Sequence, residues 1–402
     1  MMSNVNRRNT ADYGNGLSDR LEPLSPIDIK RTEDFDHLLR QMQKTSFTGR
    51  SLGEAAEVLA AMVADEKCLV VATFSGAMTV AKMGLLICDM IDWGWINIIV
   101  STGALVAHGF VEAAGMLHFK HRGEFDDEML YRRGYNRIYD TLELEKNLDR
   151  TERIIGEILD KLDTDKPFSS ELLCRELGRW LAGSTREPGI LRSAFLKEVP
   201  VYIPAFTDSE LALDVASWMV RQNMKRDEEK GLMQALSEMV FAFNPFLDLA
   251  SYTRRVLQAE RLGIFTIGGG VPRNWAQQVS PFLEILQHRC SRSLPLRKFS
   301  YGVRICPEPA HWGGLSGCTY SEGVSWGKFH SPGGGLSGCT YSEGVSWGKF
   351  HSPGEGGRFA EVLCDATVAW PILVRGVKER LDKQRESTNS AAQISGREAG
   401  DL

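Results

Sequence analysis

Short runs of consecutive apolar residues alternate along the chain with longer stretches in which apolar residues recur every three or four positions. Residues 68–74 (CLVVATF) are apolar almost throughout, as expected for a parallel strand covered on both faces. Runs of the same character occupy residues 96–101, 201–206, 263–268, 301–306 and 360–365. Helical periodicity lies between them, at 78–91, 144–162, 171–181, 211–221, 232–241 and 275–286. This alternation predicts an α/β fold with a doubly wound, mostly parallel sheet and helices on both faces.

Small and polar residues follow four of the predicted strands: Ser75 to Ala77, Thr102 to Ala104, Thr207 and Asp208, and Gly268 to Gly270. The carboxyl ends of parallel strands meet at one sheet edge, where ligands bind. A glycine after a strand often marks only a tight turn. Four such ends on one edge favour a Rossmann-like dinucleotide site, although the GxGxxG fingerprint is missing.

Composition and charge narrow the class of protein. The 402 residues, 43% apolar and 25% charged, suffice for one large core. The polar ends, residues 1–25 and 386–402, are expected to be mobile, which leaves 26–385 as the folded domain. A net charge of −5 without a basic run predicts no nucleic-acid or membrane partner. The start lacks the apolar core of a secretory signal, and ionisable residues interrupt the apolar region 83–116, so we expect a cytoplasmic protein.

The eight cysteines are scattered and form no CxxC pair. This spacing favours reduced thiols over a disulfide framework or a zinc site, and the sequence predicts no metal site.

A 21-residue segment, GGLSGCTYSEGVSWGKFHSPG, occurs at 313–333 and again at 334–354. Each copy places a carboxylate, an indole and an amine within seven residues: Glu322, Trp326 and Lys328, then Glu343, Trp347 and Lys349. A lysine beside a tryptophan in a partly dry pocket has a lowered pKa, and its free amine attacks carbonyl or imine carbon. The carboxylate can hold a cationic substrate on which the indole stacks. Spacing alone is equally compatible with a solvated surface loop.

The segment SEGVSWGK resembles the active-site motif of deoxyhypusine synthases, an acidic residue and a small residue followed by VSWGK. Further matching segments are VSTGA (100–104), GYNRIYD (134–140), PAFTD (204–208), GGGV (268–271) and CDATVAWPILV (364–374). The resemblance extends from about residue 47 to 381. The residues ahead of the lysine, CPEPAHWGGLSGCTYSEG, are similar to the bacterial deoxyhypusine synthase-like branch.

The resemblance implies an NAD-dependent transferase of alkyl groups, acting as a homotetramer, with 26–385 as its catalytic domain. In the family, spermidine is oxidised, its butylamine fragment is trapped as an imine on the motif lysine and passed to an acceptor amine, and the product is reduced with the same cofactor. The implied cofactor-binding residues are Ser75, Gly76, Ala77, Met78, Thr79, Thr102, Gly103, Ala104, Asp208, Gly269, Asp365 and Ala366.

The polyamine site matches less well. Ala107 and His108 stand where eukaryotic members have two glutamates, Asn274 replaces a histidine, and Leu315 replaces an acidic residue. Because desolvated ammonium groups need paired charges, these losses argue against spermidine bound in the same manner. The remaining substrate-binding candidates are Asp214, Glu322, Trp326, Glu343 and Trp347, with Glu210 near Asp214. His108 is interpreted either as a proton relay during imine formation or as a hydrogen-bonded core histidine.

The acceptor stays open between a free amine such as putrescine and a protein lysine. Bacteria generally lack the hypusine-bearing translation factor, which favours the free amine. Alternative functions are a homospermidine synthase-like enzyme with a free diamine acceptor and a non-catalytic protein that binds NAD or polyamines.

Two lysines compete for one catalytic position. The repeat is interpreted as a recent duplication or a sequence error, and a surplus loop of this size costs little closure entropy. Lys349 lies 16 residues before Asp365, whereas Lys328 lies 37 residues before it. The shorter connection to the predicted cofactor turn favours Lys349.

Overall fold

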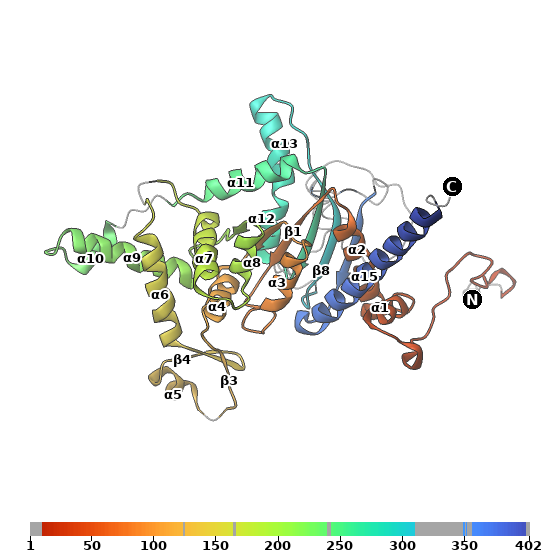
Figure 1. Ribbon diagram of the computed structural model, residues 1–402, viewed down its shortest axis with the longest axis horizontal. Helices are drawn as coiled ribbons and strands as arrows, with labels where there is room; N and C mark the ends of the chain where they lie inside the picture. The colour runs from red at the N-terminus through yellow and green to blue at the C-terminus, as the bar shows by residue number, and fades with distance from the viewer. Residues whose placement is uncertain are drawn as a thin grey trace, which may run out of the picture.

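A six-stranded parallel sheet forms the centre of the molecule (Figure 1). The computed structural model describes residues 10–123, 125–163, 166–238, 243–309, 349, 351 and 356–398, with side chains to residue 388. The strand order is β6-β2-β1-β7-β8-β9, and every pair is parallel. The strands are β1 (Cys68–Phe74), β2 (Ile98–Ser101), β6 (Val201–Tyr202), β7 (Arg261–Ile267), β8 (Phe299–Ile305) and β9 (Arg358–Val362). The predicted α/β fold class is confirmed.

Helices cover both faces of this sheet, and further helices extend beyond it (Figure 1). They are α1 (Phe35–Gln43), α2 (Phe47–Ala64), α3 (Gly84–Asp92), α4 (Gly103–Ala113), α5 (Asp127–Arg132), α6 (Glu145–Leu159), α7 (Ser170–Ser184), α8 (Ile190–Leu196), α9 (Glu210–Arg226), α10 (Leu232–Ser237), α11 (Pro245–Gln258), α12 (Gly270–Gln277), α13 (Val279–Cys290) and α15 (Ala366–Glu398). Several bounds differ from the sequence pattern, and the differences are largest in two helices. The helix expected at 78–91 begins only at Gly84, after a series of turns, and the one expected at 275–286 is two helices that meet at Gln278.

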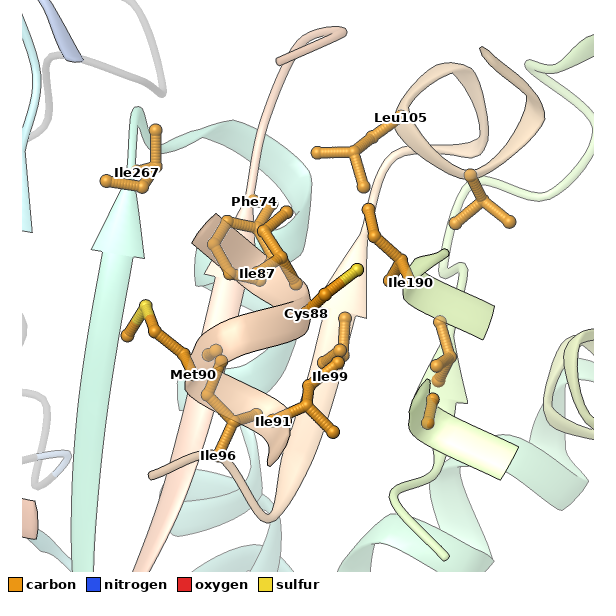
Figure 2. Packing of buried hydrophobic residues seen from close by; sticks show 14 of the residues in the cluster. Phe74, Ile87, Cys88, Met90, Ile91, Ile96, Ile99, Leu105, Ile190 and Ile267 are labelled. Atoms are coloured by element: carbon orange, nitrogen blue, oxygen red, sulfur yellow. The ribbon is translucent and has the colours of Figure 1, made fainter. Parts of the chain in front are cut away.

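Two hydrophobic clusters, one on each face of the sheet, explain the continuous apolar runs. In β1, Val70, Ala72 and Phe74 belong to the larger cluster, whereas Val71 between them belongs to the smaller one. Figure 2 shows part of the larger cluster, where Phe74 and Ile267 of the sheet lie near the side chains of α3. Because successive side chains of a strand point to opposite faces, both sets must be apolar.

A second, antiparallel sheet was not predicted. It has the order β3-β5-β4, with β3 (Phe119–Lys120), β4 (Tyr135–Ile138) and β5 (Thr141–Leu144), and lies beside α5 and below α6 in Figure 1. Its strands are two to four residues long, too short for a period-two pattern to stand out, and β3 is exposed. In β5, however, Leu142 and Glu143 are buried.

The long helix α15 packs against α1, α2 and strand β8 of the sheet. Trp370 is fully buried, and Arg380 Nε lies 2.6 Å from Asp36 Oδ1 with both side chains almost completely buried. The helix continues to Glu398, into the segment expected to be mobile, and the mobility of both ends stays a prediction. Among the described residues, no helix combines the length and the apolar character needed to cross a membrane.

Candidate active site

The turns that follow β1, β2 and β7 are locked together by hydrogen bonds at the carboxyl edge of the sheet. The Ser75 amide donates to the Ile267 carbonyl (3.1 Å), and the Gly269 amide donates to Ser75 Oγ (3.2 Å). The Thr102 hydroxyl donates to the Gly76 carbonyl (2.6 Å). These bonds bring predicted cofactor residues from three separate segments into one surface.

The turn after β6 joins this surface because Gly103 has no side chain. A Cβ on Gly103 would lie 2.1 Å from Ser209 Cβ and 2.6 Å from Ser209 Oγ. Ser209 and Thr102 are the N-cap residues of α9 and α4, and each side chain accepts from an amide of its own helix. The two helix N-termini therefore meet, with exposed Asp208 one residue before Ser209.

Two further predicted cofactor residues, Thr79 and Asp365, also have partners within the protein. Thr79 is fully buried, and its hydroxyl donates to the Leu105 carbonyl (3.0 Å), which fastens the loop after β1 to α4. Asp365 is exposed at the start of α15, where Oδ1 accepts from the Thr367 amide (2.7 Å) and hydroxyl (2.6 Å). Of the other predicted residues, Ala77, Met78 and Ala104 are half-buried, and Ala366 is buried.

Lys349 lies beside the first residue of β8. The Phe299 amide donates to the Lys349 carbonyl (2.7 Å), and the His351 amide donates to the Phe299 carbonyl (2.9 Å), which is the pattern of a parallel strand pair. β9 pairs with the same strand from Tyr301 onward. Lys349 and β9 therefore both lie beside β8.

The Lys349 side chain is buried, with 8% of the residue exposed, and Nζ donates to Asn274 Oδ1 (3.3 Å). Asn274 lies on α12, the helix that starts after the Gly268–Gly270 turn. The other predicted residues of the repeat, Lys328, Glu322, Trp326, Glu343 and Trp347, lie outside the described residues, as does Leu315.

Asp214 belongs to a cluster of carboxylates on α9 and α6. Burial, followed by the nearby charges of Glu152 and Glu210, raises the pKa of Asp214 to about 7, against the opposing effect of Arg221. Glu210 Oε2 is buried and makes no hydrogen bond to the described residues. Desolvated carboxylates in this number favour a bound cation or a proton.

His108 is buried in the second turn of α4, and its Nδ1 lies 2.6 Å from Glu143 Oε2. His118 lies on the other side of the same carboxylate, with Nε2 3.5 Å from Glu143 Oε1. Burial alone would lower the pKa of His118, but the Glu112 and Glu143 carboxylates outweigh it and raise that pKa to about 9. Burial opposes ionisation of Glu143, yet the two histidines lower its pKa to about 2.

Sequence reasoning found His108 but missed His118, Glu143 and Glu112. The four-residue spacing of His108 and Glu112 on an apolar helix was the one local signal for this cluster, because it places both on one face. Nothing in the sequence indicated that a strand of a second sheet would supply Glu143.

Comparison with known proteins gives consistent results. The model of the family described as deoxyhypusine synthase matches residues 37–333 and 330–377. "Probable deoxyhypusine synthase 2" from Methanosarcina acetivorans is 30% identical over 89% of this chain and 90% of its own length. A "Deoxyhypusine synthase-like protein" from Caulobacter vibrioides is 30% identical over 73% of this chain and 76% of its own.

The crystal structure of a putative deoxyhypusine synthase from Entamoeba histolytica has the same fold, with a TM-score of 0.51 and 13% identity, covering 88% of this chain and 96% of that one. The two segments matched by the family model overlap only at 330–333, where the first copy of the repeat ends. The second match continues from there through β9 into α15.

Proposed function

Because the chain belongs to the deoxyhypusine synthase family, we propose that it is an NAD-dependent transferase that works through an imine on Lys349. It moves an aminobutyl-type alkylamine group from a polyamine to an amine acceptor. The observation that carries this proposal is the placement of Lys349. Its buried side chain contacts Asn274 of α12, and its backbone is hydrogen-bonded to β8 of the central sheet. A nucleophile held by the rigid part of a fold is poised for repeated reaction.

Lys349 is preferred over Lys328 for a geometric reason. Its carbonyl is paired with Phe299, so only a short connection separates it from β9 and from Asp365 at the start of α15. The partner of Nζ on α12 is the neutral amide of Asn274, which orients the amine without adding a negative charge of its own. A carboxylate at that position would favour the ammonium form, which is not nucleophilic.

The residues at the carboxyl edge of the sheet fit a dinucleotide. Gly76, Gly268 and Gly270 have positive φ angles, and Gly103 allows the N-termini of α4 and α9 to meet. Backbone amides at such turns and helix ends bind pyrophosphate oxygens, and we expect the exposed Asp208 carboxylate to accept from a ribose hydroxyl. NAD bound there would accept a hydride when the donor amine is oxidised and return it when the product is reduced.

The covalent steps balance without any further reactant. Oxidation of the donor polyamine, with loss of a hydride and a proton, makes an imine. The neutral Nζ of Lys349 adds to the imine carbon, the bond from that carbon to the departing diamine breaks, and the departing nitrogen takes up a proton. The acceptor amine then adds to the same carbon and displaces Nζ, and reduction of the new imine gives the product amine.

Asp214 and Glu210 are proposed to hold the charged end of the polyamine. Both project from the first two turns of α9, directly after Asp208, so the substrate site would adjoin the cofactor surface. An ammonium group bound between them would remove the repulsion that raises the pKa of Asp214. This would account for the buried Glu210 oxygen without a hydrogen bond among the described residues and for the raised pKa of Asp214, both next to a proposed cofactor site.

The experiment follows the redox and covalent steps separately. The protein is incubated with NAD and putrescine, spermidine or agmatine, while NADH fluorescence and the released amine are measured, with and without a free diamine acceptor. Borohydride reduction and peptide mapping then locate the labelled lysine. We expect label on Lys349, loss of label in Lys349→Ala, and retained label in the matched control Lys328→Ala.

Each outcome has a definite meaning. Label confined to Lys328 would contradict the assignment of the lysine, and full activity in the Lys328→Ala, Lys349→Ala double variant would remove the imine mechanism. If NAD binds but no polyamine changes its signal, the non-catalytic alternative replaces the enzyme. Product formed with putrescine as acceptor indicates the homospermidine synthase-like reaction, whereas transfer only to a protein lysine indicates a protein acceptor.

The proposed assembly is a homotetramer. The exposed apolar side chains of α10, Leu232, Met233 and Leu236, support burial of this projecting helix by another subunit. Light scattering of the purified chain should give four times the monomer mass of 44.8 kDa. A monomeric mass would contradict this part of the proposal.

A further inference from the structure

Three ionisable side chains from separate elements converge in the buried space between α4 and the small sheet. His108 lies on α4, His118 directly precedes β3, and Glu143 lies on β5. Their exposed side-chain fractions are 8%, 0% and 2%. One ligand atom from each lies within 4.8 Å of the other two.

The facing atoms of this cluster are not satisfied by hydrogen bonds. His108 Nδ1 is close to Glu143 Oε2, but neither that nitrogen, nor His118 Nε2, nor Glu143 Oε1 has a correctly aligned hydrogen-bond partner among the described residues. Buried polar atoms are nearly always paired, so three unpaired atoms facing one another require a cause. A bound metal ion would be such a cause, because each of the three atoms would donate a lone pair to it.

We propose that His108, His118 and Glu143 form a binding site for a divalent metal ion of the zinc class. Two imidazoles and one carboxylate are an established zinc ligand set. Zinc ligands about 2.0–2.2 Å from the ion stand about 3.3 Å apart in tetrahedral geometry, and the carboxylate is 2.6 Å from one histidine and 3.5 Å from the other. All three ligand atoms lie within 4.8 Å of one another, so the widest pair must close by at most about 1.5 Å to reach this geometry. The proposal does not depend on the transferase activity.

Glu112 completes the arrangement from the outside. Its Oε1 lies 3.3 Å from His118 Nδ1 and also contacts the Lys82 amine, so it is placed to accept the N–H of the ring nitrogen that faces away from the cluster. A carboxylate in this position fixes the histidine tautomer that leaves Nε2 free for a metal. The ring orientation needed for binding is thus set before any ion arrives.

The competing interpretation is a hydrogen-bonded network of histidines and glutamates only. In that case His118 carries a proton between the Glu112 and Glu143 carboxylates, and nothing exchanges with metal. In the proposed site the ion takes the place of this proton and joins α4 to the small sheet. Because α4 begins at Thr102 and Gly103, the ion would stiffen the helix under the proposed cofactor surface.

The test uses the full untagged chain, because a histidine tag would itself bind metal. Metal content after dialysis is measured by mass spectrometry, and the chelated protein is then titrated with Co²⁺ while its visible absorption is recorded. We expect about one zinc-class ion per chain and the intense bands of four- or five-coordinate Co²⁺. Thermal unfolding should shift to higher temperature on adding Zn²⁺.

Variants make the assignment specific. Glu143→Gln and His118→Ala should weaken Co²⁺ binding at least about 100-fold, and Glu112→Gln about 10–100-fold. His121→Ala is the matched control, since it removes a histidine three residues from His118 whose Nε2 lies 3.3 Å from the Phe125 carbonyl, and it should bind Co²⁺ normally.

The result in the unsubstituted protein is decisive even if a variant fails to fold. Absence of stoichiometric metal, together with a Co²⁺ spectrum no different from that of the free aqueous ion, would overturn the proposal in favour of the hydrogen-bonded network. Unchanged Co²⁺ affinity in folded Glu143→Gln would overturn it as well, because the ion would then be bound elsewhere.

Discussion

Replacing Gly103 with alanine tests whether the two helix N-termini are held as closely as the structure indicates. The new Cβ would lie 2.1 Å from Ser209 Cβ, whereas carbon atoms pack at about 3.5–4.0 Å. α4 and α9 must therefore move apart by about 1.5 Å, or one of them must tilt. Ser209 cannot simply rotate away, because the clash is with its Cβ and its hydroxyl donates to the Phe206 carbonyl (2.6 Å).

The expected cost follows from these contacts. Overpacking of a tight contact lowers the free energy of unfolding by about 1–3 kcal/mol. We expect a value toward the upper end here, because Ser209 Cβ is bonded directly to the backbone and cannot move without it. Gly183→Ala in α7 is the matched control, because nothing lies within 4 Å of its new Cβ and alanine is the better helix former by about 0.5–1 kcal/mol. We expect Gly103→Ala to lower, and Gly183→Ala to keep or raise, the free energy of unfolding measured with urea.

A second substitution separates steric conflict from other causes. Ser209→Gly removes both close atoms and leaves Ser209 Cα at 3.4 Å, so it should rescue most of the loss in the double variant. By itself it should cost only a few tenths of a kcal/mol as an N-cap change. If Gly103→Ala is as stable as Gly183→Ala, or if Ser209→Gly gives no rescue, the close approach of α4 and α9 is wrong. NAD affinity, measured by calorimetry, should fall and recover in parallel.

Three further predictions concern buried polar groups. Arg380→Ala leaves Asp36 with the half-exposed Arg40 as an ion-pair partner, and it should lower the free energy of unfolding in urea by about 3 kcal/mol. Adding Asp36→Asn should recover part of this loss. No loss in the single variant would contradict the buried pair. The pKa of Asp214 is raised above its unfolded value of 3.8 to about 7, so its contribution to stability is complete below pH 3.8 and is lost as pH rises through 7. Asp214→Asn should therefore match the unsubstituted protein near pH 4 and be more stable by about 2 kcal/mol at pH 8, after allowance for solvent screening; equal stability at both pH values would contradict the raised pKa. Thr79→Val removes the hydroxyl donor that joins the loop after β1 to the Leu105 carbonyl of α4, and it should cost about 0.5–1.5 kcal/mol. Thr79→Ser should restore most of this loss, and a neutral Thr79→Val would show that the hydroxyl is not needed.

The sequence alone was sufficient for the fold class and for the residues that lie at the carboxyl edge of the sheet, where the cofactor site is proposed. Continuous apolar runs such as residues 68–74 report burial on both faces, and burial on both faces nearly requires a parallel sheet between helices. Glycine and polar residues after β1, β2, β6 and β7 then mark the carboxyl edge, because that end of every parallel strand faces the same way. The family likeness also came from short contiguous motifs that need no folding to be recognised.

The local sequence pattern could not choose between two interpretations that share the same local sequence. Lys328 and Lys349 have the same neighbours along the chain, and the pairing of Lys349 with Phe299 is a contact that no local pattern reveals. The boundary between α12 and α13 was missed for a related reason, since both helices have apolar residues at helical spacing and the break lies between them.

Tertiary structure alone decided which distant residues meet. His108, His118 and Glu143 converge only because the short strands β3 and β5 pair beside α4, and Gly103 must be glycine only because Ser209, more than a hundred residues away, packs against it. Periodicity records how deeply each position is buried, which is a property of one segment. Contact between segments depends on how their buried faces fit together, and that is settled only when the whole chain packs.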